Sequence, residues 1–346
     1  MYEGPLIGIW VHTSKNRKRI LKLYQGFHNL NLNLYAFTSS SIFWNKQQIL
    51  GLSLVDNKWK ESMFPFPHAV YNHYYNKKAI TIQRLNNIIG QDKCFNRINW
   101  FNKWEVYTLL KQSNLKRYIP DTFLFNEVNV TKLLKKYRLV YIKPAYGNKG
   151  KSVYRVELKE NGDTYISLHS LPPRFICRKN EDLQKRLDEL LNEKIFIVQK
   201  GIQSNQINHQ YYDIRVLVQK DIRGKWTPST TICRVANKHY FNTSVYESIY
   251  DAEKILDQIF PLKKMKENIL QSINRISINA AQVLETHMGL LGEISVDFVL
   301  DEEMKLWIIE LNGSPQKSIY KDIKNFKHKQ LIYSRPMEYA YYLSTH

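Results

Sequence analysis

Two apolar runs near the C-terminus, joined by a short polar loop, constrain the fold of this chain more than any other feature. They span residues 295–300 and 306–311, and this pattern predicts a β-hairpin. Asp297 lies inside the first run, Glu310 lies near the end of the second, and Asn312 follows two residues later. Alternate residues of a strand share one face, so Glu310 and Asn312 should point the same way. A paired neighbouring strand would bring Asp297 to the same place.

The oxygen atoms of these three side chains suggest a metal site. Acidic side chains inside apolar strands are uncommon unless a partner or a metal ion binds them. Two carboxylates and an amide form an all-oxygen site, which suits Mg²⁺ bridging phosphates. The alternative is a surface hairpin whose acidic side chains are only solvated.

Strand-like and helix-like segments follow each other along the chain and separate it into three regions. Residues 1–98 predict a small α/β domain with a parallel sheet, from a strand at 6–11, a helix at 18–30 and a strand at 34–37.

The second region covers residues 99–200. It predicts helices at 103–112, 131–137 and 181–192, and strands at 123–125, 139–143, 153–156 and 195–199. Either Asn129 or Thr131 could cap the second of these helices. The third region, residues 201–346, predicts a helix at 264–284 and strands at 214–219, 230–235, 292–300 and 306–311.

Composition excludes several classes of protein. The chain has 346 residues, of which 43% are hydrophobic, so it is long enough for two or three packed units and too apolar to be disordered. No run approaches 18 apolar residues, and the first residues do not resemble a signal peptide, so neither a membrane-spanning helix nor secretion is expected. Cys94, Cys177 and Cys233 are too far apart for a disulfide framework, which favours the reducing cytoplasm.

Basic residues outnumber acidic ones by 51 to 31, giving a formal charge of +20. This charge could indicate an anionic partner such as an acidic peptide or a nucleotide, or it could reflect a general bias of composition. Nucleic acid is an unlikely partner, because no long basic block or RNA-binding signature is present.

A glycine-containing loop follows the strand that ends at Lys143. Gly147 and Gly150 would let backbone N–H groups approach an anion, and three lysines in residues 143–151 supply positive charge. The segment is not a P-loop, because a strand rather than a helix follows it. It is either a phosphate-covering loop or an ordinary basic hairpin.

Charged residues also occur in two later strands. Asp213 and Arg215 lie two positions apart at the start of one strand, and Arg234 lies near the end of the next strand. These residues could form a structural ion pair, or an arginine could stabilise charge on a carbonyl or phosphoryl oxygen. Lys103, taken alone, is expected to be a solvated helix residue.

Taken in chain order, these features resemble the ATP-grasp superfamily. The residues that carry the resemblance are Lys103, Lys143 with its glycine loop, Gln199, Lys200, Gly201, Ile202, Asp213, Arg215, Arg234, Asn242, Asp297, Glu310 and Asn312. Within that superfamily the chain is similar to the YheC/YheD family of endospore coat-associated proteins, through segments 66–72, 101–107, 140–144, 213–221 and 310–312.

The resemblance implies an α+β ATP-grasp fold, in which two α+β subdomains (99–200 and 201–346) sandwich ATP after a small α/β pre-ATP-grasp domain (1–98). It implies that Asp297, Glu310 and Asn312 hold Mg²⁺, that Arg215 and Arg234 contact substrate, and that Arg234 and Lys143 are catalytic. The implied nucleotide-binding residues are Lys103, Lys143, Tyr146, Gly147, Gly150, Gln199, Lys200, Gly201, Ile202, Asp213 and Asn242. In this set, Lys103 and Lys143 would contact phosphates, the backbone of residues 200–202 would face adenine, and Asp213 would lie near the ribose.

The implied function is an ATP- and Mg²⁺-dependent carboxylate–amine ligase that works through an acyl phosphate. Its substrates would be a carboxylate donor and an amine acceptor, such as an amino acid or an acidic peptide, in the cytoplasm or associated with the spore. Two alternatives stay open. One is an ATP-dependent phosphotransferase, and the other is a non-catalytic spore-associated protein, since residues 240–247 lack the Gly-Gly pair that many relatives have after the Asn242 position.

Overall fold

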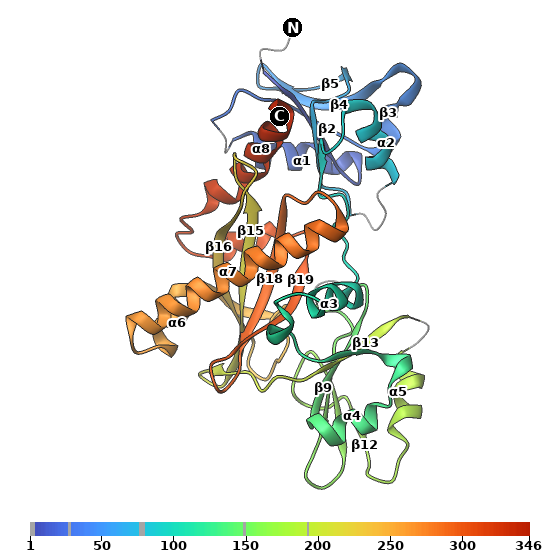
Figure 1. Ribbon diagram of the computed structural model, residues 1–346, viewed down its shortest axis with the longest axis vertical. Coiled ribbons are helices and arrows are strands. Elements are labelled where there is room, and N and C mark those ends of the chain that lie inside the picture. Colours follow the sequence, from blue (N-terminus) through green and yellow to red (C-terminus); the bar gives the residue numbers. More distant parts are fainter. Residues whose placement is uncertain (1–3, 27–28, 76–79, 148–149, 192–193) are drawn as a thin grey trace.

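In the computed structural model, three β-sheets are built from successive parts of the chain (Figure 1). The structure describes residues 4–26, 29–75, 80–147, 150–191 and 194–346. Helices lie against each sheet, so the chain has the expected α+β character. The first sheet uses residues 6–95, the second residues 122–200 and the third residues 206–312.

The first sheet has the predicted parallel centre. β1 pairs in parallel with β2 on one side and with β6 on the other, and every residue of β1 is buried. Continuous burial explains why this strand reads as an unbroken apolar run. The elements of this unit are β1 (Leu6–Trp10), α1 (Ser14–Gln25), β2 (Asn33–Phe37), β3 (Ile42–Phe43), β4 (Gln48–Val55), β5 (Lys58–Pro65), β6 (Ala69–Asn72), α2 (Ile80–Ile89) and β7 (Cys94–Phe95). The helix expected at 18–30 thus begins and ends earlier.

An antiparallel hairpin, β4–β5, extends this sheet and was not predicted from the sequence. Asp56 and Asn57 form its turn with φ angles of 49° and 60°. Two consecutive residues with positive φ match the twist of paired strands, and Asp and Asn tolerate that conformation better than most residues.

The second sheet is antiparallel, with the order β12-β11-β10-β9-β13-β8. Leu134 and Leu187 lie in the apolar core that α4 and α5 form against it. Asn129, rather than Thr131, caps α4 by accepting a hydrogen bond of 3.0 Å from the Lys132 N–H. The elements are α3 (Lys103–Lys111), β8 (Thr122–Leu124), α4 (Val130–Tyr137), β9 (Leu139–Pro144), β10 (Tyr154–Leu158), β11 (Thr164–Leu168), β12 (Phe175–Cys177), α5 (Leu183–Leu191) and β13 (Phe196–Lys200).

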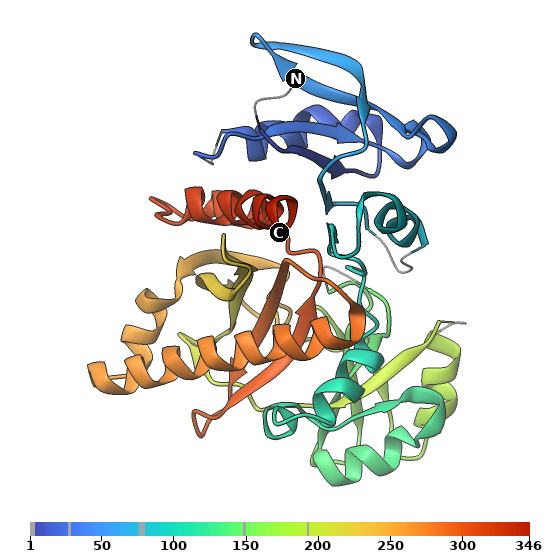
Figure 2. The ribbon, with the colours of Figure 1, turned by 45° about the horizontal axis from the view of Figure 1, so that its top comes forward.

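The third sheet contains the predicted C-terminal hairpin. β18 and β19 are antiparallel neighbours at one side of the order β17-β16-β15-β18-β19. The long helix α7 lies across this sheet, and α3 packs against α7 (Figure 2). The elements are β14 (Gln206–Ile207), β15 (Gln210–Lys220), β16 (Trp226–Ala236), β17 (Tyr246–Asp251), α6 (Ala252–Ile259), α7 (Lys263–Met288), β18 (Glu293–Leu300), β19 (Leu306–Asn312) and α8 (Lys329–Thr345).

Helix α8 joins the first and third sheets. It packs against α1, β1 and β6 of the first unit and against β15 and β16 of the third (Figure 1). Tyr339 of α8 shares one apolar core with Phe95 and Leu217. The outermost parts of the sequence therefore lie together, and the N-terminal unit rests on the C-terminal subdomain.

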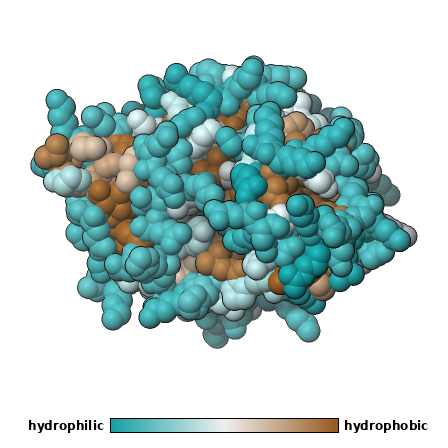
Figure 3. Space-filling model, turned by 90° about the horizontal axis from the view of Figure 1, so that it is seen from below, coloured by the Kyte–Doolittle hydropathy of each residue, from teal (hydrophilic) through white to brown (hydrophobic). Residues whose placement is uncertain are grey.

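The face seen in Figure 3 is mostly hydrophilic, and hydrophobic residues reach it in separated places. Among the described helices, none has the length and apolar character needed to cross a bilayer. All three cysteines are buried and free.

Candidate functional site

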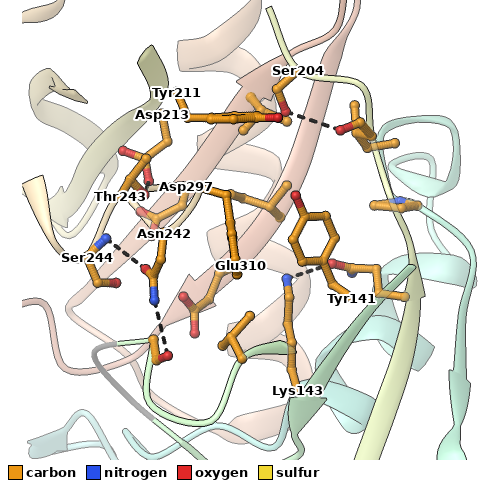
Figure 4. Close-up of a pocket in the computed structure, with 18 of the residues that line it drawn as sticks. Tyr141, Lys143, Ser204, Tyr211, Asp213, Asn242, Thr243, Ser244, Asp297 and Glu310 are labelled. Atoms are coloured by element: carbon orange, nitrogen blue, oxygen red, sulfur yellow. Dashed lines mark hydrogen bonds between the residues drawn. The ribbon is translucent and has the colours of Figure 1, made fainter. Parts of the chain in front are cut away.

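A pocket lies between the second and third sheets, and most of the predicted site residues line it. Twelve of the sixteen are at its wall: Lys103, Lys143, Gly147, Gly150, Gln199, Lys200, Ile202, Asp213, Arg234, Asn242, Asp297 and Glu310. Figure 4 shows Lys143 on one side and Asn242 on the other, with Glu310 between them. Tyr146, Gly201, Arg215 and Asn312 do not line this pocket.

Two lysines from different elements enter the pocket. The Lys103 Nζ, on the first residue of α3, lies 3.1 Å from the Glu310 Oε1 and donates a 3.1 Å hydrogen bond to the Gly147 carbonyl. The Lys143 Nζ, on β9, donates a 2.8 Å hydrogen bond to Gln199 on the neighbouring strand β13 (Figure 4). Both lysines therefore bring positive charge to the wall of one pocket.

Lys143 is the more perturbed of the two lysines. The pKa of Lys143 is lowered to about 8, chiefly by burial and also by the nearby charge of Lys103, while Glu310 partly opposes both effects. Because the pKa of Lys143 lies close to neutral pH, a bound anion would stabilise the protonated, charged form of this lysine.

The acidic strand pair faces buried arginines. Asp297 on β18 is the register partner of Glu310 on β19 and also of Arg215 on β15. Arg215 donates two hydrogen bonds to Asp297, of 2.7 and 2.6 Å, and Arg234 donates a third, of 3.1 Å. Arg234 also donates through Nε to Asp213, at 2.9 Å. The four buried charges form a closed network across β16, β15 and β18.

This network defines the state of Asp297. Burial alone would raise the pKa of the Asp297 carboxyl, but Arg215 and Arg234 outweigh burial and hold that pKa below its usual value. The carboxylate is therefore charged at neutral pH. Of the two interpretations that the sequence left open, the structural ion pair is present. A role for either arginine in binding substrate remains a proposal.

The glycine loop approaches the C-terminal subdomain through Gly150. The Asn242 side chain donates a 3.2 Å hydrogen bond to the Gly150 carbonyl (Figure 4). Gly150 has a φ of +63°, and a Cβ atom there would lie 2.2 Å from the Asn242 Nδ2, so only glycine fits. Asn148 and Lys149 lie outside the described residues. Tyr146 packs edge-on against Trp100, with ring centroids 5.9 Å apart.

The segment after β13 crosses from the second sheet to the third. The N–H groups of Lys200 and Gly201 already donate to the carbonyls of Asp121 and Leu139, each at 2.8 Å. A Cβ atom at Gly201 would lie 2.2 Å from the Leu139 side chain, so this glycine serves packing. Ile202 does line the pocket. Any backbone donor to a ligand in this segment is therefore the Ile202 N–H rather than those of the two preceding residues.

Four aromatic residues at the pocket were absent from the predicted set. They are Tyr141, Tyr211, Tyr212 and Phe241. The rings of Tyr141 and Phe241 have centroids 5.7 Å apart, from opposite subdomains. Tyr141 lies two residues before Lys143 on the same strand, so the shared face of β9 could have indicated it. Nothing local to the sequence brings Tyr211 and Phe241 to this place.

The oxygen donors fit Mg²⁺ only together with ligand oxygens. Among the described residues, no group of three or more His, Cys, Asp or Glu side chains could hold a metal ion. Asp297 and Glu310 supply two carboxylates, and Mg²⁺ in nucleotide sites is commonly bound by one or two carboxylates plus phosphates. Asn312 pairs with Ser295 across the hairpin and lines a neighbouring cavity, and Glu310 and Arg234 line both cavities.

Two α+β subdomains that enclose a lysine- and carboxylate-lined pocket, preceded by a parallel α/β unit, define an ATP-grasp protein. The chain belongs to the YheC/D-like ATP-grasp family, whose profile matches residues 91–343. It is 27% identical to the endospore coat-associated protein YheD of Bacillus subtilis, over 99% of this chain and 80% of that protein. It is 22% identical to YheC of the same organism, over 82% of this chain and 80% of that protein.

Solved structures share the fold. The D-alanine–D-alanine ligase from Coxiella burnetii superposes with a TM-score of 0.54 at 10% identity, over 98% of this chain and 95% of that one. The VanG D-Ala:D-Ser ligase from Enterococcus faecalis gives a TM-score of 0.53 at 12% identity, over 99% of this chain and all of that one. At such identities the likeness establishes the ATP-grasp fold alone.

Proposed function

We propose that this protein is an ATP- and Mg²⁺-dependent carboxylate–amine ligase that forms ADP. One observation carries the proposal. Lys103, Lys143, Asp297 and Glu310 come from four separate elements and line a single pocket. Neither a folding core nor an exposed surface needs two lysines facing two carboxylates in this way, whereas Mg²⁺-bound triphosphate needs both charges.

The pocket offers distinct surroundings for each part of ATP. Tyr141, Phe241 and Ile202 would contact the adenine ring, with the Ile202 N–H as the backbone donor. Lys103 and Lys143 would neutralise the phosphates. Asp213 is a weaker candidate for the ribose than the sequence suggested, because its carboxylate already accepts hydrogen bonds from Arg234 and, at 2.6 Å, from the Thr243 hydroxyl.

Magnesium, when bound, would supply positive charge that reduces electrostatic repulsion during phosphoryl transfer. Asp297, Glu310 and Asn312 are the residues that we propose to hold it. Glu310 is the principal candidate, because it is partly exposed and lies at the junction of the two cavities.

The proposed reaction has two steps. A substrate carboxylate oxygen attacks the γ-phosphorus, forming a new P–O bond while ADP leaves, which gives an acyl phosphate. An amine then attacks the acyl carbon, phosphate leaves, and the amine loses a proton. Positioning and charge neutralisation dominate such transfer, so no covalent enzyme nucleophile is required. Lys143 would offset charge on the phosphoryl group, while Arg234 would do so through the part of its guanidinium that Asp213 and Asp297 leave free.

The test is product analysis with a panel of carboxylates, ATP, Mg²⁺ and hydroxylamine. We expect ADP, phosphate and a hydroxamate, since hydroxylamine traps an acyl phosphate. A phosphorylated product without hydroxamate would instead support the phosphotransferase, and AMP release would contradict the mechanism. Absence of Mg-ATP binding at millimolar nucleotide would favour a non-catalytic protein.

Glu310→Gln removes the charge of the principal carboxylate without changing its size. We expect turnover to fall by about 100-fold or more, because the cation and the phosphates lose their main protein anion. Glu303→Gln, in the exposed loop of the same hairpin, is the matched control and should leave turnover unchanged. Equal activity of both variants would remove Glu310 from the proposed site.

A further inference from the structure

A second, larger cavity adjoins the nucleotide pocket and has a chemical character of its own. Its volume is about 660 Å³, within the range of ligand-binding pockets and more than a single small amino acid requires. Arg234, Ser244 and Glu310 lie on the wall that the two cavities share. The remaining walls come from α1, from β17 and from the segment after β19, where the first and third units meet.

The floor of this cavity holds a polar group with no partner. Ser295 on β18 is fully buried, and its hydroxyl has no hydrogen-bond partner in the structure. A buried hydroxyl left unpaired is unfavourable, and this one belongs to a residue that lines the cavity, where a ligand atom would give it a partner. The guanidinium groups of Arg215 and Arg234 lie at the same floor. A carboxylate fits these donors.

The rim of the cavity is cationic. Arg19 of α1 and Lys321 are exposed lining residues, and neither forms an ion pair with a described carboxylate. Helix α1 carries five basic residues and no acidic one. Asp322 is the acidic residue nearest in sequence, and it accepts a 2.6 Å hydrogen bond from Tyr246 at the wall.

The other charged and titratable groups around the cavity are compensated. Glu293, at 2.6 Å, neutralises the buried Lys317. Burial, helped by the charge of Lys317, lowers the pKa of His73 to about 4, so this imidazole is neutral at physiological pH. Glu310 is paired with Lys103. Arg19 and Lys321 are therefore the charged lining residues without an ion-pair partner among the described residues, and both are exposed.

We propose that the second cavity binds an acidic peptide, with one carboxylate on the floor beside Ser295 and a second near Arg19 and Lys321. The aromatic side chains of Tyr24, Tyr246 and Tyr333 line the space between floor and rim and would contact the peptide chain. The inference rests on the proposed function, because the floor carboxylate is the one that would receive the γ-phosphoryl group. It adds the substrate class, which is an acidic peptide with at least two separated anionic groups.

The test is calorimetric titration with tri-L-glutamate, tri-L-alanine and tripolyphosphate, each with and without Mg²⁺ and a non-hydrolysable ATP analogue. Tri-L-glutamate should bind at least tenfold more tightly than tri-L-alanine, and its affinity should fall as salt is raised. Equal binding of tri-L-alanine, or equal binding of tripolyphosphate without nucleotide, would overturn the peptide assignment. If the nucleotide analogue binds and tri-L-glutamate does not, this inference fails while the nucleotide site stands. If tri-L-glutamate binds and the analogue does not, the proposed function fails instead.

Two variants locate the binding. The double substitution Arg19→Ala/Lys321→Ala should weaken tri-L-glutamate about fivefold to tenfold at low salt and leave the nucleotide analogue unaffected. Lys263→Ala/Lys264→Ala at the exposed start of α7 removes the same charge and is the matched control. Ser295→Ala should also weaken tri-L-glutamate without lowering the melting temperature, because its hydroxyl makes no hydrogen bond within the protein. An unchanged affinity in both test variants would contradict the proposal.

Discussion

Lys143 is a single residue whose charge depends on what occupies the pocket. Its pKa of about 8 lies well below that of a solvated lysine, chiefly because burial disfavours the ammonium form. Bound phosphate would raise this pKa again, so nucleotide binding near pH 8 should take up protons, and affinity should fall as the pH rises through 8. Titrations at pH 8 in buffers of different ionisation enthalpy measure this uptake.

The control for this prediction is Lys143→Arg, which keeps the charge but does not titrate in that range. Its nucleotide binding should show little proton uptake between pH 7 and 9. Identical uptake by the wild type and the variant would mean that another group titrates.

Asp297 shows a second residue-scale consequence, because its carboxylate is the counter-ion of two buried arginines. Asp297→Asn should therefore lower the free energy of unfolding by about 3–5 kcal/mol, because it leaves buried guanidinium charge without its counter-ion. Denaturant unfolding measures this.

Asp257→Asn is the control for that measurement. Asp257 pairs with Lys266 at the surface, where its side chain is 60% exposed, and surface pairs contribute little. A similar, small change for both variants would show that the buried network does not stabilise the fold.

At the scale of elements, local patterns predicted most strands and helices, and they predicted that the two strands carrying Asp297 and Glu310 pair as a hairpin. The partners of Asp297 across the sheet could not be foreseen. Arg215 lies 82 positions away, and their pairing depends on β15 lying beside β18, which no local pattern specifies. The same limit applies to Tyr211 and Phe241 in the pocket. Helix α8 was missed because its apolar residues do not follow one face and Pro336 interrupts its pattern.

At the scale of the whole molecule, a buried polar cluster ties the first unit to the third. Glu293 on β18 accepts a 2.5 Å hydrogen bond from the Tyr71 hydroxyl of β6 and pairs with Lys317 at 2.6 Å. Lys317 in turn donates a 3.1 Å hydrogen bond to Tyr24 of α1. Because these residues come from both units, the cluster couples their stability.

Glu293→Gln tests this coupling. The substitution leaves the Lys317 charge buried without its carboxylate, so amide hydrogen exchange in β1, β6 and α1 should speed up together with exchange in β18. Glu303→Gln makes the same substitution at an exposed position, and it should not alter amide hydrogen exchange in the first unit or in β18. Faster exchange confined to β18 would show that the units are independent.

The wall shared by the two cavities, made of Arg234, Ser244 and Glu310, has a practical consequence for inhibition. Because the two cavities adjoin at these three residues, one compound could be designed to carry an adenosine moiety into the first and a dicarboxylate tail into the second. Joining the halves makes the second contact intramolecular, so such a bisubstrate molecule should bind far more tightly than either fragment alone.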